Sequence, residues 1–391
     1  MPDRSLPPPP PDALAHSERL RALIAAEIAA GAGLLPFDRY MELALYAPGL
    51  GYYAAGARKL GPAGDFVTAP EISPLFGRCM ATQCAEILDA LGGGDLLEFG
   101  AGTGALAAEL VATLARLDTA WREYLILEPS PDLRERQRET LADRVPAALP
   151  RVRWLDRLPD VFRGVMLGNE VLDAFPVHRF RIGSDGVEEG FVTTGPRGLV
   201  ETWAPARSAG LDAAVRAIES EYGALPVGYC SEINGRLAPW LRSVGSALQQ
   251  GALLLVDYGY AAAEYYHPER NAGTLLCHYR HRVHADPLRW PGLQDITASV
   301  DFTAVARAGE AAGLSLAGYA AQSAFLLGTG IDRWLAESDP EDVVAHQRLV
   351  QAVRTLMLPG GMGERFKVIG LCRGLDLAWR GFSFRDLRNR L

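Results

Sequence analysis

The sequence predicts an α/β fold of the doubly wound type, in which helices cover both faces of a mostly parallel β-sheet. Through the middle of the chain, short apolar runs alternate with segments of helical periodicity, as in parallel sheets. A glycine-rich turn follows the first of these runs and opens directly into a helical segment. The 391 residues, 49% of them hydrophobic, suffice for a large core, so disorder of the whole chain is excluded.

We expect the chain to begin with an arm followed by two helices. Proline fills positions 7 to 11. Because proline fits neither a helix interior nor a sheet ladder, residues 1–15 are predicted to form a disordered, Pro-rich arm. From Ser17, apolar residues recur at helical spacing until Gly31 stops the helix. A second helix is predicted near Phe37–Tyr46, before a loop rich in proline and glycine.

The central sheet is predicted from apolar runs and its covering helices from the periodic segments between them. We expect strands at Asp95–Phe99, Tyr124–Leu127, Val152–Leu155, Val165–Leu167, Ala252–Val256, Leu314–Ala321 and Phe366–Cys372. We expect helices at Ser73–Leu91, Ala105–Leu117, Pro131–Leu141 and Gly235–Leu248. Between Val177 and Thr202 the residues alternate in steps of two, with turn sequences at 183–186 and 195–198. This pattern predicts β-hairpins inserted between strands of the sheet.

The composition excludes several partners and locations. Lys and Arg total 39 against 47 Asp and Glu, a net charge of −8 that gives no attraction for nucleic acid or anionic lipid. No apolar stretch reaches about 18 residues, and the N-terminus has no secretory or transit pattern. We therefore expect a cytoplasmic protein without membrane insertion. The five cysteines lack paired C-x-x-C spacing and predict free thiols rather than a zinc site.

The strongest local signal is the turn that contains Gly100, Gly102 and Gly104. Glycine is needed where φ is positive or where the backbone approaches a ligand closely. Glu128 ends the next predicted strand, where a carboxylate can accept both hydroxyls of a ribose, and Asp156 ends the third. A tight turn with ordinary surface acids is the alternative. Strand, turn, helix and acid together favour a nucleotide-cofactor site.

The acid beside this turn discriminates between two cofactors. NAD and S-adenosylmethionine both bind at turns of this kind. Glu98 lies two residues before the first glycine, where its charge would repel a pyrophosphate but can engage the amino group of a methionine moiety. The late strands at 314–321 and 366–372 also suit a methyltransferase sheet whose final strand is antiparallel. The sequence therefore favours S-adenosylmethionine as cofactor.

Longer motifs occur in order along the chain, at Gly64–Gly77 (GDFVTAPEISPLFG), Leu97–Gly104 (LEFGAGTG), Gly168–Pro176 (GNEVLDAFP) and Val256–Gly259 (VDYG). Together they resemble the MidA-like family of S-adenosylmethionine-dependent methyltransferases over roughly residues 17–375. The resemblance implies a class I methyltransferase fold: a Rossmann-like doubly wound sheet, N-terminal helices and an inserted β-hairpin and helical substrate region. Mitochondrial members of this family act as complex I assembly factors that symmetrically dimethylate an arginine on a core subunit.

The resemblance also suggests domains and further cofactor residues. Thr68, Pro70 and Glu71 fall in the first motif, in a loop that can fold over the cofactor, although prolines alone would shape a helix entry there. Asn169, in the third motif, is assigned to the cofactor as well. The expected domains are a helical segment with a cofactor-covering loop at 16–92, a methyltransferase core at 93–176 and 250–375, and an inserted substrate-binding region at 177–249.

Two acids are the candidates for the methyl-transfer chemistry. An arginine substrate keeps its positive charge and must approach a cationic cofactor, so a carboxylate is needed beside it. Glu170 and Asp173 follow the fourth predicted strand, at the edge where doubly wound sheets bind ligands. If this segment is helical, their i, i+3 spacing puts both on one face. Capping of a local turn by Asp173 or Asn169 is the alternative. By resemblance to arginine methyltransferases, Glu170 is taken as the first contact of the guanidinium.

The run from His278 to His284 raises the question of a metal site. In an extended strand these two histidines share one face while His281 lies on the other, and no cysteine or acid stands at ligand spacing. We therefore predict no metal and a polar loop near the substrate. A second polar cluster follows at Asp295, Thr297 and Asp301. Substrate orientation is one role for such residues, and a helix N-cap is the commoner one.

The leading hypothesis is a cytoplasmic protein-arginine methyltransferase that uses S-adenosylmethionine. Its partner is then a protein substrate that carries the target arginine, with a respiratory complex I subunit as one candidate. An assembly scaffold with a retained cofactor fold and a small-molecule methyltransferase are the alternatives. The intact glycines and acids of the turn disfavour a degenerate site. A homodimer is one candidate for the oligomeric state.

Overall fold

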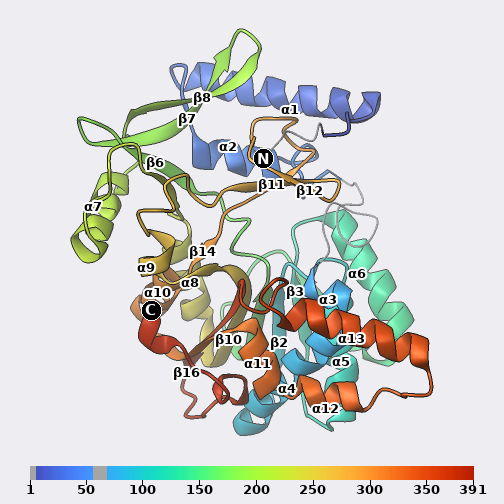
Figure 1. Cartoon of the computed structure of the whole chain (residues 1–391). Coiled ribbons are helices and arrows are strands. Elements are labelled where there is room, and N and C mark those ends of the chain that lie inside the picture. Colours follow the sequence, from blue (N-terminus) through green and yellow to red (C-terminus); the bar gives the residue numbers. More distant parts are fainter. Residues whose placement is uncertain (1–5, 56–67) are drawn as a thin grey trace. The chain divides into compact units, whose positions relative to one another are not determined.

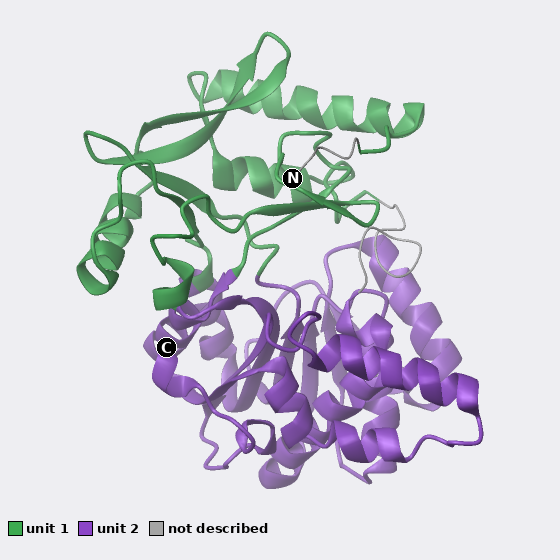
Figure 2. Ribbon diagram, in the orientation of Figure 1, with its two compact units in different colours: residues 1–66, 173–237, 262–299 green, residues 67–172, 238–261, 300–391 purple. Residues whose placement is uncertain are grey.

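The computed structural model describes residues 6–55 and 68–391. The chain divides into two units, each assembled from separate stretches of sequence (Figure 2). Unit 1 comprises residues 1–66, 173–237 and 262–299. Unit 2 comprises residues 67–172, 238–261 and 300–391, and it contains the glycine turn.

The centre of unit 2 is a β-sheet (Figure 1). Its strand order is β15-β16-β10-β5-β2-β3-β4. Its strands are β2 (Asp95–Phe99), β3 (Tyr124–Leu127), β4 (Val152–Leu155), β5 (Phe162–Asn169), β10 (Leu248–Tyr260), β15 (Ser315–Ala321) and β16 (Phe366–Arg373), and β14 (Val300–Asp301) also pairs with β10. Neighbours from β10 to β4 are parallel, whereas β16 runs antiparallel to β10 and to β15. The predicted doubly wound sheet with an antiparallel strand near its end is thereby confirmed.

Helix α4 of unit 2 starts and ends at capping residues. Ser73 accepts a hydrogen bond from the Leu75 N–H (3.2 Å) at the start of α4, and Gly92 ends that helix with a φ of 68°. The helices are α3 (Ala69–Ile72), α4 (Pro74–Leu91), α5 (Ala105–Arg116), α6 (Pro131–Arg144), α8 (Leu237–Ala247), α10 (Phe302–Ala311), α11 (Gln322–Gly328), α12 (Ile331–Ala336) and α13 (Val343–Met357), with short 3₁₀ turns at Pro146–Arg151, Arg380–Phe382 and Arg388–Arg390. Apolar residues of helices and strands share one core, so the sheet is covered as expected.

Unit 1 has its own sheet, of order β1-β7-β6-β9 with β8 paired to β7, and a smaller sheet β12-β11-β13. Its elements are α1 (Pro11–Ala30), β1 (Leu35–Pro36), α2 (Phe37–Tyr46), β6 (His178–Ile182), β7 (Val187–Gly195), β8 (Gly198–Pro205), α7 (Leu211–Tyr222), β9 (Cys230–Ile233), α9 (Ala262–Tyr265), β11 (Leu276–Tyr279), β12 (Arg282–His284) and β13 (Asp295–Thr297). Antiparallel pairing of β6 with β7 and of β7 with β8 confirms the predicted hairpins.

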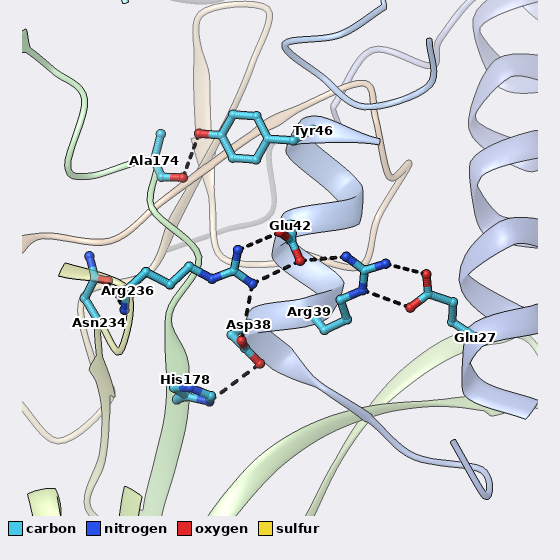
Figure 3. Close-up of polar contacts among 9 residues, drawn as sticks. All are labelled: Glu27, Asp38, Arg39, Glu42, Tyr46, Ala174, His178, Asn234 and Arg236. Carbon is cyan, nitrogen blue, oxygen red and sulfur yellow. Dashed lines mark hydrogen bonds and ion pairs between the residues drawn. The ribbon is translucent and has the colours of Figure 1, made fainter. Parts of the chain in front are cut away.

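A charged network joins distant segments of unit 1 (Figure 3). Arg39 on α2 pairs with Glu27 on α1 (2.6 Å) and with Glu42 on its own helix (2.6 Å). Arg236, which follows β9, also reaches Glu42 (2.6 Å). Hydrogen bonds from Arg236 and Arg39 lower the pKa of Glu42 to about 2. The network therefore ties both N-terminal helices to the chain that follows the main sheet of this unit.

The structure corrects the start of the first helix. Because α1 spans Pro11–Ala30, residues 11–15 are helical and do not belong to the predicted arm. Pro11 lies in the first turn of the helix, where a missing N–H loses no helical hydrogen bond. A proline run excludes a helix interior but not a helix start, and the prediction failed at this distinction. Residues 1–5 of the arm lie outside the described residues.

The two units also have other boundaries than the predicted domains. Residues 262–299, predicted as core, belong to unit 1, because Cys277 and Ile296 share an apolar cluster with α2. Residues 238–249, predicted as part of the insertion, belong to unit 2. Packing between segments far apart in the sequence decides these boundaries.

Two glycines allow the central strands of unit 2 to approach closely. Gly164 and Gly251 have φ of 145° and 133°, and a Cβ on Gly251 would lie 1.9 Å from the Gly164 carbonyl oxygen. We expect Gly251→Ala to lower the free energy of unfolding by about 2–4 kcal/mol, because the added atom forces the two backbones apart. Urea unfolding measures this change. Gly360→Ala, whose Cβ would meet nothing within 4 Å, is the control. Equal unfolding midpoints for the two variants would contradict the close approach.

Candidate functional site

The glycine turn connects β2 to α5 in unit 2. Gly100, Gly102 and Gly104 have φ of 61°, 54° and 85°, a region that side chains rarely allow. A Cβ on Gly104 would lie 3.1 Å from the Cα of Gln137 on α6, so this glycine permits close helix packing. The Gln137 side-chain N–H donates to the Gly102 carbonyl oxygen (3.0 Å). The turn therefore has the open backbone that a nucleotide cofactor requires, and α6 holds it in place.

Glu128 lies directly after β3 and is 4% exposed. Its carboxylate accepts hydrogen bonds from the Ser130 N–H (2.9 Å) and from Gln137 (3.2 Å). Burial raises its pKa. Each carboxylate oxygen has a second lone pair, so these two bonds leave acceptor capacity for ribose hydroxyls. Gln137 thus orients the acid and the glycine turn together, and the sequence analysis does not identify it. The sequence signal for Gln137 is that it is uncharged while its neighbours in the same helix are charged.

Glu98, on β2, is 2% exposed and accepts a hydrogen bond from the Tyr124 hydroxyl (2.6 Å). Burial raises the pKa of Glu98 to about 7, against the effect of the hydrogen bond. Tyr124 lies on the neighbouring strand β3 and is a further residue that sequence reasoning missed. The sequence signal for Tyr124 is its hydroxyl at the start of an otherwise apolar strand.

Asp156 lies after β4 with its side chain 90% exposed, and it pairs with Arg134 on α6 (2.7 Å). Arg134 also donates to the carbonyl oxygens of Glu128 (2.5 Å) and Leu155 (2.8 Å). The guanidinium therefore joins the ends of β3 and β4. The structure places Asp156 at the predicted edge of the sheet, but as the outer member of an ion pair.

Helix α3 brings part of the first motif to the glycine turn. The Thr103 hydroxyl, inside the turn, donates to the carboxylate of Glu71. Thr68 precedes α3 without capping it through its side chain, and Pro70 lies in the first turn of this helix. The structure therefore gives Glu71 a direct contact with the turn, whereas Thr68 and Pro70 shape the entry to the helix. Residues 64–67 of the motif lie outside the described residues.

Glu170 follows β5 in the left-handed conformation, with a φ of 54°. Its carboxylate accepts hydrogen bonds from the Asn169 side chain (3.0 Å) and from the Ala69 N–H at the start of α3 (3.4 Å). The Oδ1 atom of Asn169 is buried and has no hydrogen-bond partner among the described residues. Buried acceptors are normally satisfied, so this atom fits a donor group of a bound ligand.

Asp173 does not share a helix face with Glu170. The segment from Glu170 to Phe175 forms bends and turns, because a left-handed residue cannot continue a right-handed helix. Asp173 itself belongs to unit 1, is 6% exposed, and accepts the Ala298 N–H at its carbonyl oxygen (2.9 Å). The condition under which the i, i+3 spacing would put the two acids on one helix face is therefore not met.

The histidine run forms a hairpin and not the predicted polar loop. His278 pairs with Val283, and Cys277 pairs with His284, across strands β11 and β12. Arg280 and His281 make the turn with φ of 47° and 58°. Both positive angles match a two-residue hairpin turn, although neither residue is the usual Asn or Gly. Within residues 6–55 and 68–391, no group of three or more His, Cys, Asp or Glu side chains is arranged to hold a metal ion.

Two acids of the second polar cluster bind groups of the chain itself. Asp301 caps α10 through the Ala304 N–H (3.0 Å), which confirms the N-cap interpretation. Asp295 is buried on β13 and accepts a hydrogen bond from the Tyr53 hydroxyl (3.0 Å). Thr297, on the same strand, is buried as well.

The strand order, the glycine turn after β2 and the carboxylate after β3 define the class I fold of S-adenosylmethionine-dependent methyltransferases. Comparison with known proteins agrees. Residues 79–320 match a family model described as "Putative S-adenosyl-L-methionine-dependent methyltransferase".

Curated relatives and solved structures cover nearly the whole chain. Two proteins named "Protein arginine methyltransferase NDUFAF7, mitochondrial", from Danio rerio and Mus musculus, are 30% and 31% identical over 89% and 87% of this chain and 86% and 81% of their own. A "likely methyl transferase from Burkholderia thailandensis bound to S-adenosyl-homocysteine" is 47% identical, with a TM-score of 0.95 over 99% of this chain and 100% of that one. The chain therefore belongs to the MidA-like family of S-adenosylmethionine-dependent methyltransferases, and its cofactor is S-adenosylmethionine.

The prediction of a cytoplasmic protein is wrong. It rests on the lack of a targeting pattern, whereas the matching relatives from fish, mouse and human are all named mitochondrial. The lack of a recognisable targeting pattern is no evidence for any one compartment, and so it could not support a cytoplasmic location. None of the helices in the described ranges has the length and apolar character needed to cross a membrane.

The contacts of Glu128 predict a loss of cofactor affinity on its removal. We expect Glu128→Ala to weaken binding of S-adenosylhomocysteine by about 1.5–3 kcal/mol, because hydrogen bonds to a charged acceptor are lost. Isothermal titration calorimetry measures this difference. Glu135→Ala, which removes an exposed acid from helix α6, should bind as the parent does. Parent-like affinity of Glu128→Ala would assign the ribose contact to another residue.

The raised pKa of Glu98 predicts how stability changes with pH. The buried Glu98 carboxyl contributes to the free energy of unfolding as long as it is protonated. This contribution is fully present below the ordinary pKa of 4.5 and is lost as pH rises through about 7, because ionisation of the buried acid then opposes folding. In Glu98→Gln this loss cannot occur. Between pH 5 and pH 8, we expect the unfolding free energy of the ligand-free parent to fall by about 2–3 kcal/mol relative to the variant. Urea unfolding at both pH values checks this, and parallel pH profiles would refute it.

Proposed function

We propose that this methyltransferase transfers the methyl group of S-adenosylmethionine to an arginine guanidinium of a protein substrate. The observation that carries the proposal is the carboxylate of Glu170, held at the carboxyl end of β5 by Asn169 and by the Ala69 N–H. The relatives named protein arginine methyltransferases, which match over 87% or more of the chain, support it.

An anion at this edge answers the main electrostatic problem of the reaction. A guanidinium stays protonated and is repelled by a sulfonium. The carboxylate of Glu170 would attract the guanidinium, direct one of its nitrogens at the methyl carbon and offset the positive charge as the N–C bond forms and the S–C bond breaks. S-adenosylhomocysteine is then the leaving group, and the proton of the methylated nitrogen passes to solvent. Because Glu170 is already fixed by two hydrogen bonds, little ordering is needed when substrate arrives.

The residues that follow strands β2, β3, β4 and β5 have the chemistry to bind the cofactor. Bound S-adenosylmethionine supplies the electrophilic methyl group. We infer that Glu128 accepts its ribose hydroxyls, that Glu98 and the unpaired Oδ1 of Asn169 face its amino acid end, and that Asp156 lies toward its base. The remaining contacts are assigned to the glycine turn and α3, at Gly100, Gly102, Gly104, Thr68, Pro70 and Glu71.

The protein acceptor is inferred from the family. We propose a subunit of respiratory complex I as the first candidate and the insertion at residues 177–249 as the region that binds it. Labelling of a cell extract with tritiated cofactor, followed by mass spectrometry of methylated proteins, tests this. Methylarginine in a complex I subunit is the expected result. Label only in small molecules, or no transfer at all, would favour the small-molecule enzyme or the scaffold. Light scattering separately tests whether the protein is a homodimer.

Glu170→Gln separates methyl transfer from cofactor binding. The variant keeps the size of the side chain and the acceptor for Asn169 but removes the charge. We expect S-adenosylhomocysteine to bind almost normally and methyl transfer to fall by about 100-fold or more, because the lost interaction is electrostatic. Asp173→Asn should lose less. Calorimetry and tritium transfer measure the two effects, with Glu135→Gln as an exposed control. Full activity of Glu170→Gln would remove this acid from the chemistry.

A further inference from the structure

The end of β10 presents a buried carboxylate to the segment that carries Glu170. Parallel pairing of β5 with β10 runs up to Asn169 and Val256, and beyond this pair β5 turns away. Asp257, the next residue of β10, is 1% exposed. Its Oδ2 atom accepts hydrogen bonds from the N–H groups of Val171 (3.1 Å) and Leu172 (2.9 Å). One buried carboxylate oxygen therefore holds two successive amides.

The amide before these two is held by the same strand. The Glu170 N–H donates to the Val256 carbonyl oxygen (2.8 Å). Three successive N–H groups, at residues 170, 171 and 172, thus face β10, an arrangement of backbone donors that typically surrounds an anion. Here the anion belongs to the chain itself, as the side chain of Asp257. Its Oδ1 atom also accepts the Tyr258 N–H (2.9 Å), which fixes the carboxylate in turn.

These bonds act on a residue with a strained backbone. Glu170 is a non-glycine residue with a φ of 54°, an unfavourable conformation that persists only where neighbouring contacts enforce it. The contacts that enforce it are the amides held by β10. The backbone conformation at Glu170 also sets the direction of its side chain toward Asn169 and Ala69.

We propose that Asp257 is a positioning residue, whose carboxylate holds the amides after Glu170 and thereby directs the Glu170 carboxylate toward the acceptor. This inference rests on the proposed role of Glu170 in methyl transfer. No contact of Asp257 with substrate or cofactor is required. Asp257→Asn keeps one acceptor oxygen, removes the charge and sets an N–H donor against the amides on one side of the group, whereas Asp257→Ser keeps a single shorter acceptor without charge.

A matched control exists in the same unit. The Oδ1 atom of Asp386 accepts two backbone amides, from Tyr319 (3.3 Å) and Arg388 (3.0 Å), next to the edge strand β15. Asp386→Asn therefore removes a similar set of bonds away from β5 and β10.

Hydrogen exchange of the protein without acceptor tests whether Asp257 holds the amides of Val171 and Leu172. We expect the amides of Val171 and Leu172 to exchange at least about tenfold faster in Asp257→Asn than in the parent. In Asp386→Asn these two amides should keep the parent rate. Unchanged exchange in Asp257→Asn overturns the inference, and so does loss of folding in both Asp257 variants, because the carboxylate then serves the whole fold.

A double-mutant cycle tests whether this positioning serves methyl transfer, with tritium transfer to arginine in a total cell protein extract as the assay. Asp257→Asn should reduce the initial rate at saturating cofactor by about tenfold or more in the parent background. In the Glu170→Gln background it should reduce the rate by less than about threefold, because the group that it positions is gone. S-adenosylhomocysteine affinity should stay within about threefold throughout, which a loss of general stability would not reproduce.

The outcomes separate the two proposals. Equal rate losses from Asp257→Asn in both backgrounds overturn the positioning role and leave the proposed function intact. No arginine methylation by the parent overturns the proposed function. Full activity of Glu170→Gln removes Glu170 from the chemistry, and the positioning role of Asp257 with it, but leaves arginine methylation standing. Hydrogen exchange then still decides whether Asp257 holds this segment.

Discussion

One buried amide holds the cofactor edge of the sheet together. The side chain of Gln137 donates to the Gly102 carbonyl oxygen (3.0 Å) and to Glu128 (3.2 Å), and it accepts a hydrogen bond from Trp154 (2.8 Å). Its partners lie after β2, after β3 and on β4. Because a buried amide without partners costs free energy, α6 fits this position only when all three segments are in register. The open glycine turn and the orientation of Glu128 both depend on this arrangement.

A second constraint lies at the end of β5, the strand that pairs with β2, where chemistry and backbone strain coincide. The candidate acid Glu170 is itself the left-handed residue that ends β5. Strain of this kind collects at functional sites, because a fold otherwise removes it. The amides that hold it belong to the same short segment as the acid, and their acceptors belong to β10. The sheet therefore specifies the direction of a side chain at its edge as well as the core beneath it.

Local patterns predicted the parallel strands of unit 2 closely, whereas helices α10 to α13 were not predicted. Strands Asp95–Phe99, Tyr124–Leu127 and Val152–Leu155 have the expected bounds, because short apolar runs between turn residues are typical of buried parallel strands. The hairpin of β11 and β12 escapes such prediction. Its turn residues Arg280 and His281 adopt positive φ without the small residues that mark a hairpin, so only the pairing of the strands reveals it.

The sequence by itself determined the strands, the helix caps, the glycine turn and the motifs of the family. Each of these depends on residues within a few positions of one another, where side-chain chemistry acts directly on the backbone. Only the tertiary structure decided which residues complete the site and where the units divide. Leu172 and Asp257 are 85 positions apart in the sequence, and no periodicity or composition connects them. Their contact exists because two parallel strands end at the same edge of one sheet, and that proximity is a property of the folded chain.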